Sequence, residues 1–283
     1  MSIMEVLTDI LGSLRTSGSV YFCDFLEPPW QLDFAGETRA IFHLVRRGRC
    51  QIDVDGKTRE LAPGDFVFLS PGVDHIMHGR DPKDPHTMLL CGYCHFESAE
   101  DDMLMRALPR FVLLRGEEMD QWPWLTRTLE HLSAEYRSGA PGSELTVNKL
   151  TEVLLVQLLR VDFGRHDRAG IVAALKDKRL NKALTELHGD PGKDWTIESA
   201  AATAAMSRSG FARLFKNTLE VSFFDYLTRL RMRLARDMLQ TGTRRVAEIG
   251  ERVGYQSELS FVKAFKKLHG MTPRAFRRQG EQP

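Results

Sequence analysis

The chain has 283 residues, of which 42% are hydrophobic and 27% are charged, and its formal net charge is +1. This composition is typical of a globular protein with one large domain or two ordinary ones. No apolar run approaches the roughly 18 to 20 residues that a membrane span requires. The acidic N-terminal segment lacks the profile of a signal peptide. We therefore expect a cytoplasmic protein with no membrane partner.

The small net charge is the sum of an acidic front and a basic back. From Ile171 to the end, the sequence contains 21 Lys and Arg against 12 Asp and Glu, a balance of +9. The residues before Ile171 contain 18 against 26, a balance of −8. This asymmetry indicates two domains, with a polyanion as the partner of the basic one. The alternative is that the charge only keeps the surface soluble.

Residues 21–96 have the pattern of short strands. The alternating runs at 50–54 and 66–69 are separated by turn sequences, among which Asp55-Gly56 suits a hairpin because Gly tolerates positive φ. Many short antiparallel strands with frequent turns predict a sandwich or a small barrel.

The periodicity changes after the strands. Residues 124–136 and 144–161 are predicted to be helices, and the second carries an apolar stripe at helical spacing. This stripe consists of Val147, Leu150, Leu154, Leu158 and Val161. It indicates either core packing or a dimer seam. Residues 163–170 contain almost no apolar side chain, which favours a linker, and the chain from Ile171 onward is predicted to be wholly helical.

A repeat of about 50 residues lies in this last part. Each copy has a short helix of small residues, a turn, a Ser that can cap the next helix, and a second helix with Phe at positions i and i+4. The Phe pairs, Phe211/Phe215 and Phe261/Phe265, must be buried, so the opposite helix faces are free to contact DNA. The side chains predicted to contact DNA are Ser207, Arg208, Ser209, Arg213, Lys216, Gln256, Ser257, Glu258, Lys263 and Lys266.

A long helix is predicted between the two copies, at residues 222–240. Its length is about 28 Å at 1.5 Å per residue, close to the roughly 34 Å of one DNA turn. Its predicted apolar face consists of Phe223, Tyr226, Leu227, Leu230, Leu234 and Met238. Its predicted cationic face consists of Arg229, Arg233 and Arg236. This cationic face either approaches DNA or is an ordinary solvated surface.

The repeat resembles the C-terminal DNA-binding domain of the AraC/XylS family of transcription regulators. The resemblance is most specific in the second copy, at residues 246–249, 253–255 and 261–266, and in the closing segment 270–277. It implies a regulator that binds double-stranded DNA, forms a homodimer and works with RNA polymerase. Three residues depart from the family pattern, namely Glu220 for Gly, Ala200 for Leu and Gly250 for Ala. The first puts the geometry of a turn in doubt, and the other two suggest looser packing of the scaffold helices.

The front of the chain resembles the cupin-type β-barrel sensor domain of many such regulators, through residues 43–48, 61–65 and 70–75. It is similar in particular to a sub-group with Pro28-Pro29-Trp30 and Leu90-Cys91-Gly92. In that architecture the barrel senses a signal, and the helices after it form the dimer contact.

The fold class expected from these patterns is an α+β multidomain protein. Its parts are a cupin-like β-barrel with dimerisation helices at 1–163, a linker at 164–172, and an all-α domain with two helix-turn-helix units at 173–283.

We expect no catalytic residues, no metal and no cofactor in the β domain, with a structural or regulatory metal as the alternative to the absence of a metal. Catalytic cupins hold a metal with about three His and one Glu, whereas only His43 and His75 match here. These two histidines are candidates for an effector pocket, or are simply hydrogen-bonded groups of the interior. An enzyme with an appended helical bundle, and a protein-interaction module, are the alternatives from other functional classes.

Cys91 and Cys23 are the redox candidates, because the sub-group with cysteines at these positions includes oxidant-responsive regulators. Strand alternation places Cys91 and His95 on one face, where an imidazolium would lower the pKa of the thiol. The same alternation separates Cys91 from Cys94, which disfavours zinc binding by this pair. Buried, inert cysteines and a small organic effector remain the alternatives.

Overall fold

The computed structural model describes Val6, Thr8 and residues 16–79, 86–96, 109–165 and 170–280. The chain divides into two compact units. One contains residues 15–101 and 108–166 and is called the β domain, and the other contains residues 167–283 and is called the helical domain.

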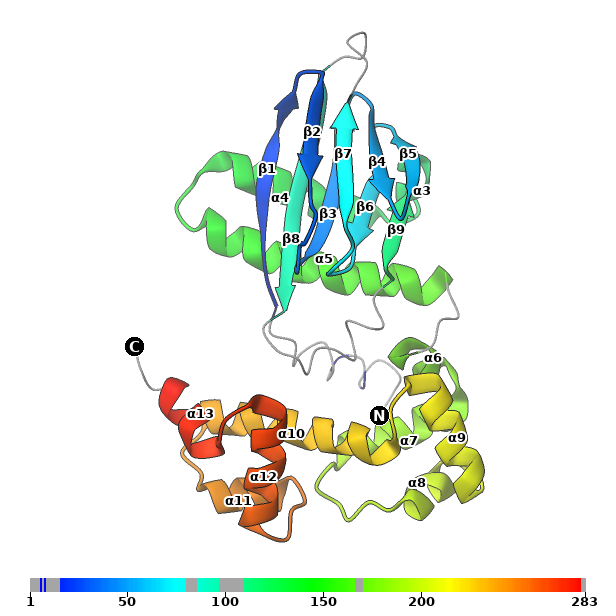
Figure 1. The fold of residues 1–283 in the computed structure, drawn as a ribbon, viewed down its shortest axis with the longest axis vertical. Helices are drawn as coiled ribbons and strands as arrows, with labels where there is room; N and C mark the ends of the chain where they lie inside the picture. The colour runs from blue at the N-terminus through cyan, green and yellow to red at the C-terminus, as the bar shows by residue number, and fades with distance from the viewer. Residues whose placement is uncertain are drawn as a thin grey trace. The chain divides into compact units, whose positions relative to one another are not determined.

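The β domain contains nine described strands in two antiparallel sheets (Figure 1). The five-stranded sheet has the order β1 (Thr16–Leu26), β8 (Thr87–Phe96), β3 (Ala40–Arg47), β6 (Phe66–Leu69) and β9 (Phe111–Leu114). The four-stranded sheet has the order β2 (Trp30–Asp33), β7 (His75–Gly79), β4 (Cys50–Val54) and β5 (Lys57–Leu61). No pairing joins the two sheets among the described strands, so the structure is a sandwich rather than a closed barrel.

The main core of this domain lies between the two sheets. Val45, Leu89 and Cys91 of the five-stranded sheet pack in one apolar cluster with Ile52 and Met77 of the four-stranded sheet. Burial of alternate side chains of each strand on this side accounts for the period-two pattern of the sequence.

Helices cover the other face of the five-stranded sheet. They are α3 (Gly116–Met119), α4 (Pro123–Ser138) and α5 (Ser143–Arg165), and both α4 and α5 contact β1 (Figure 1). The predicted α5 stripe is buried except for Leu150, which is half-buried. The stripe is therefore used for core packing, as the first of the two readings expected.

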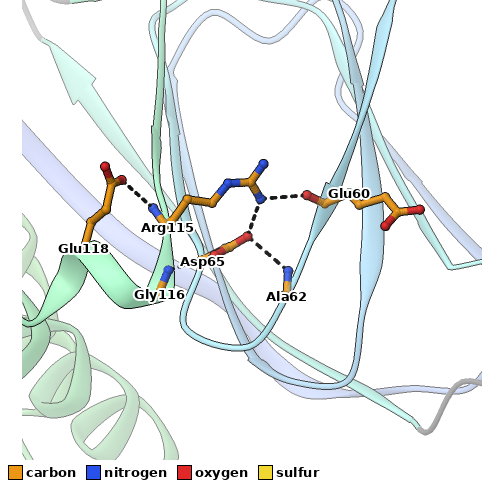
Figure 2. A network of polar contacts seen from close by, with 6 residues as sticks. All are labelled: Glu60, Ala62, Asp65, Arg115, Gly116 and Glu118. Atoms are coloured by element: carbon orange, nitrogen blue, oxygen red, sulfur yellow. Dashed lines mark hydrogen bonds and ion pairs between the residues drawn. The ribbon is translucent and has the colours of Figure 1, made fainter.

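A buried carboxylate ties the Pro63-Gly64-Asp65 turn to the start of α3 (Figure 2). Asp65 is 3% exposed and accepts hydrogen bonds from the backbone N–H groups of Ala62 and Gly116, at 3.1 and 2.8 Å. It also forms an ion pair of 2.7 Å with Arg115. A buried charge is stable only when it is paired and hydrogen-bonded, and this network provides both.

The helical domain consists of helices joined by short turns throughout residues 170–280, as predicted. The helices are α6 (Ile171–Lys176), α7 (Lys178–Gly189), α8 (Ile197–Thr203), α9 (Arg208–Leu219), α10 (Phe223–Thr241), α11 (Val246–Arg252), α12 (Glu258–His269) and α13 (Pro273–Gly280). The first helix-turn-helix unit is α8–α9 and the second is α11–α12. Figure 1 shows the two units near opposite ends of α10.

The predicted fold class is confirmed in both parts, with a sandwich in place of a closed barrel. The ends of the predicted linker 164–172 belong to helices, because α5 ends at Arg165 and α6 begins at Ile171. In the described part of the chain, every helix is too short or too polar to cross a lipid bilayer.

Candidate DNA-binding surface and thiol site

Each second helix of the repeat begins at a capping serine. Ser207 accepts a hydrogen bond of 3.2 Å from the N–H of Gly210, and Ser257 accepts one of 3.2 Å from the N–H of Ser260. These bonds satisfy backbone N–H groups that a helix start leaves without a partner. The two predicted caps are therefore confirmed, and they define where α9 and α12 begin.

The paired phenylalanines anchor both helices. Phe211, Phe215, Phe261 and Phe265 are all 0% exposed. In the first unit, the Phe215 ring lies 5.6 Å from that of Phe223 in α10. In the second unit, the Phe265 ring lies 5.7 Å from that of Phe276 in α13. The anchors fix one face of each helix, so the opposite face is turned to solvent.

All ten side chains predicted to contact DNA lie on exposed positions of these two units. They are Ser207, Arg208, Ser209, Arg213, Lys216, Gln256, Ser257, Glu258, Lys263 and Lys266. Two of them have ionic partners in the free protein: Arg208 lies 3.0 Å from Glu198, and Glu258 lies 3.6 Å from Arg274. Exposed pairs of this kind contribute at most about 1 kcal/mol, so they exchange readily for other partners.

Helix α10 differs from its predicted pattern of one apolar and one cationic face. Arg236 is 3% exposed and therefore belongs to the interior rather than to a cationic face. The apolar face also shifts along the helix. Phe223 and Tyr226 pack on the first unit, whereas the second half buries Met232, Ala235 and Leu239 against the second unit. The helix contacts both units, and each contact uses a different side.

Arg231 is a connecting residue that the sequence interpretation missed. Its guanidinium donates hydrogen bonds to the carbonyls of Pro191 at 2.9 Å and Lys193 at 2.8 Å, before the first unit, and of Gly254 at 3.2 Å, in the turn of the second. Burial lowers its pKa. The sequence did carry a signal for this contact. Arg231 lies four positions after Leu227, so a charged residue continues the apolar stripe of the helix.

The three departures from the family pattern are accommodated. Glu220 ends α9 in the left-handed conformation, with φ of 59°, so the turn keeps the geometry expected of Gly. The expected looser packing is wrong at Gly250, because a Cβ there would lie 3.1 Å from the Phe261 ring. Ala200 is 1% exposed, so its small side chain lies in the packed interior of the helical domain.

A chain of hydrogen bonds runs from Cys91 through two histidines inside the β domain. His43 Nδ1 lies 3.0 Å from Cys91 Sγ, His43 Nε2 lies 2.9 Å from His75 Nε2, and His75 Nδ1 lies 3.1 Å from the Val73 carbonyl. Burial is the main cause that lowers the pKa of both imidazoles, so both rings are neutral. Each neutral ring carries one N–H.

These constraints determine the direction of every bond. The Val73 carbonyl can only accept, so His75 donates from Nδ1 and accepts at Nε2. His43 then donates from Nε2 and accepts at Nδ1. The thiol of Cys91 is therefore the donor to His43, and a proton that leaves this thiol has an acceptor in contact with it.

The expected partner of Cys91 is corrected by this geometry. His95 is exposed, and the imidazole that contacts the sulfur is that of His43. Burial raises the pKa of the Cys91 thiol, opposite to the expected direction, so the resting thiol is protonated. Tyr21, a residue that is 37% exposed, has a smaller effect in the opposite direction and lowers the pKa of the Cys91 thiol.

Cys23 and Cys91 belong to opposite faces of the β1–β8 pair. Cys23 pairs in register with Leu90, whereas Phe22 pairs with Cys91. Burial raises the pKa of the Cys23 thiol as well. A disulfide between the two thiols therefore requires a local rearrangement of β1, because strand neighbours on opposite faces point apart.

The two predicted pocket histidines face each other, and both ring nitrogens of His43 are engaged, so their donors do not converge on one point. In the described part of the chain, no three or more His, Cys, Asp or Glu side chains are arranged to hold a metal ion. A cavity of about 260 Å³ lies on the helix side of the five-stranded sheet, lined by residues that include Leu44, Arg46 and Glu130. Neither His43 nor His75 lines it.

Two capped recognition helices with buried aromatic anchors and exposed polar flanks, in a chain that also contains a cupin-like sandwich, define a helix-turn-helix DNA-binding regulator. Comparison with known proteins agrees. The Cupin family model matches residues 5–164, and the Helix-turn-helix domain model matches residues 200–279. The chain belongs to the AraC-like transcription regulators, with an N-terminal domain of the cupin family.

Several relatives match along their whole length. An AraC-like transcription regulator of Streptomyces lividans is 31% identical over 99% of this chain and 100% of its own. An HTH-type transcriptional regulator of Haemophilus influenzae is 29% identical over 97% and 99%. The RCS-specific HTH-type transcriptional activator RclR of Escherichia coli is 28% identical over 99% of each chain.

Proposed function

We propose that this regulator binds specific DNA sites through the exposed faces of α9 and α12, and that its β domain controls this binding in response to a signal. The first residues after each Ser cap contact base edges, and the later lysines contact phosphates. The observation that carries the proposal is the opposition between four fully buried Phe anchors and ten exposed polar side chains on the same two units.

Salt dependence of binding by the purified full chain tests the DNA surface. Replacement of Lys216, Lys263 and Lys266 by Ala should reduce the slope of log affinity against log salt by about 0.9 for each phosphate contact removed. The matched control replaces Arg47, Arg49 and Lys57, three exposed cations of the β domain, by Ala. An equal effect of both triple variants, or no duplex binding at low salt by the unaltered chain, would contradict the proposal.

The regulator is further proposed to act as a homodimer through α4 and α5, with residues 164–172 as the linker to the helical domain. Leu145 and Val153 of α5 are 66% and 45% exposed, and Tyr136 of α4 is 38% exposed. Such apolar side chains favour a partner helix. Analytical ultracentrifugation should show that Val153→Glu dissociates the dimer, whereas Glu144→Gln does not. Contact with RNA polymerase is proposed from the family resemblance.

Oxidation of Cys91 is the signal that the geometry favours. With hydrogen peroxide as the two-electron oxidant, the thiol proton passes to His43 and the sulfur attacks one peroxide oxygen. The S–O bond forms, the O–O bond breaks, and the leaving hydroxide takes up the proton from His43, so the products are a sulfenic acid at Cys91 and water. The Cys91–His43–His75 chain supports this step because it supplies the acceptor inside a site where burial otherwise keeps the thiol protonated. In a second step, after β1 rearranges, the Cys23 thiol would attack the sulfenic acid of Cys91, so that the disulfide bond forms and water leaves.

A reporter gene behind a target promoter tests the oxidation proposal, with hydrogen peroxide and hypochlorite as probes. Cys91→Ser should abolish the response and leave binding in reducing buffer intact. The matched control is Cys94→Ser, since Cys94 is equally buried on the same strand but faces the helices. An unchanged response of Cys91→Ser refutes the proposal.

The cavity beside α4 favours a small organic molecule as the second candidate signal. Its lining combines Arg46 with Glu130 and apolar groups, so a small polar molecule fits its chemistry. Thr126→Trp should fill the cavity and abolish induction by such a molecule. Native mass spectrometry of the full chain, isolated from its own cells, should detect the bound molecule, and its absence under inducing conditions would refute this candidate.

A further inference from the structure

An exposed leucine stands at the start of the second recognition helix. Leu259 is the second residue of α12 and is 66% exposed. Its neighbours on either side, Glu258 and Ser260, are exposed as well, whereas Phe261 is fully buried. Leu259 therefore belongs to the face that the Phe anchors turn away from the core.

The position of Leu259 in the helix limits what the side chain can contact. The first turn of a recognition helix reaches base edges in the major groove. A leucine has no hydrogen-bonding group, and the one apolar group that a base pair presents in that groove is the C5-methyl of thymine. Contact with this methyl would remove apolar surface of both partners from water, which is favourable by about 0.8 kcal/mol per buried carbon group.

The neighbouring charges would bring the leucine to the groove. Lys263, one turn further along α12, is exposed and can contact a backbone phosphate. Glu258 is held by Arg274 at 3.6 Å, which offsets the repulsion between its carboxylate and DNA. An isolated exposed leucine on another surface would need no explanation, but here it lies among the side chains that approach DNA.

The equivalent position of the first unit carries a different chemistry. Ser209 is also the second residue after its cap, and its hydroxyl can donate to or accept from any base. We infer that Leu259 reads a thymine methyl in the half of the operator that the second unit contacts, and that the two units select bases by different chemistry. This inference rests on the proposed DNA surface.

A methyl-deletion experiment tests the inference. Binding sites are first selected from random duplex DNA with the full chain. Each thymine in the half assigned to α12 is then replaced by deoxyuridine, which lacks only the methyl group. For the unaltered protein, one replacement should reduce affinity about three- to fivefold. Leu259→Ala should lose a similar factor on the original site and be insensitive to that replacement.

Ser209→Ala is the matched control and should keep full sensitivity to the same replacement. The inference is overturned if Leu259→Ala is as sensitive as the unaltered protein, or if no thymine methyl in that half affects binding. Failure to select any site would refute the proposed DNA surface instead, so the two failures are distinguishable. Because Leu259 is exposed, the thermal stability of Leu259→Ala should stay unchanged.

Discussion

The two helix-turn-helix units of this regulator use the same plan with different residues at their turns. Both have a serine cap, a phenylalanine pair and a cation six residues after the cap. In the second unit the two left-handed turn positions are Gly254 and Gly270, with φ of 84° and 75°. In the first unit the equivalent positions are Ala205 and Glu220, with φ of 53° and 59°.

This difference shows that the left-handed turn geometry is imposed by the packing of the buried Phe pairs and does not require glycine. A side chain in the left-handed region is strained, and the strain persists only where the surroundings impose it. Position 254 favours glycine for a second reason, which is lack of space. A Cβ there would lie 2.6 Å from the Gly192 carbonyl oxygen and 2.5 Å from the Arg231 guanidinium. The second unit is therefore held closely against the loop before α8.

The largest expected effect removes an anchor. Phe215→Ala and Phe265→Ala should each reduce the free energy of unfolding of the helical domain by about 3 to 5 kcal/mol, since each deletes a fully buried ring. Urea denaturation of the full chain measures the loss. The control is Phe224→Ala, whose ring is 51% exposed. A loss in only one unit would break the equivalence of the two anchors.

A methyl group at the second turn should have the next largest effect. Gly254→Ala combines left-handed strain with the contacts at Gly192 and Arg231, so we expect a loss of about 2 to 4 kcal/mol. Gly270→Ala is the control, because no atom lies within 4 Å of its added Cβ, and should cost only about 1 kcal/mol. Equal losses in thermal unfolding would show that the close approach at Gly254 is unimportant.

Arg213 and Lys263, the cations six residues after each cap, should differ in the part of the DNA that they contact. Arg213→Ala should weaken operator binding by about 1 to 3 kcal/mol while leaving random DNA less affected, because a guanidinium can bind a base edge at two points. Lys263→Ala should weaken both equally and lower the salt slope by about 1. Binding titrations with operator and random duplexes measure both affinities. An equal loss of affinity on the two duplexes for Arg213→Ala would show that Arg213 contacts a phosphate.

The smallest expected effect is a gain. Glu220→Gly should raise the free energy of unfolding by about 0.5 to 1 kcal/mol, since it relieves left-handed strain at the end of α9. Glu220→Gln is the control, because it removes the charge near the helix C-terminus but keeps the strain, and should gain only a few tenths of a kcal/mol, about 0.3. If both variants gain equally, charge and not conformation distinguishes this turn from that at Gly270.

Much of the helical domain could be predicted because its signals are local. The spacing of Phe211 and Phe215, the serine caps and the turn residues act within a few positions of the chain. The predicted boundaries of α10 agree with the structure to within one residue, since Ser222 caps it and the helix begins at Phe223. Leu259 carried no such signal, because exposure and not periodicity distinguishes it.

The two-part organisation, the strand and helix periods and the repeat with its exposed recognition faces could all be predicted from the amino-acid sequence. The contacts between distant segments became visible in the three-dimensional structure. It gave Cys91 the partner His43 instead of His95, buried Arg236, and joined Arg231 both to the loop before α8 and to the turn of the second unit. The physical reason is that short-range patterns depend on helix and strand geometry, whereas these contacts depend on how β3 meets β8 and on which side of α10 each unit packs.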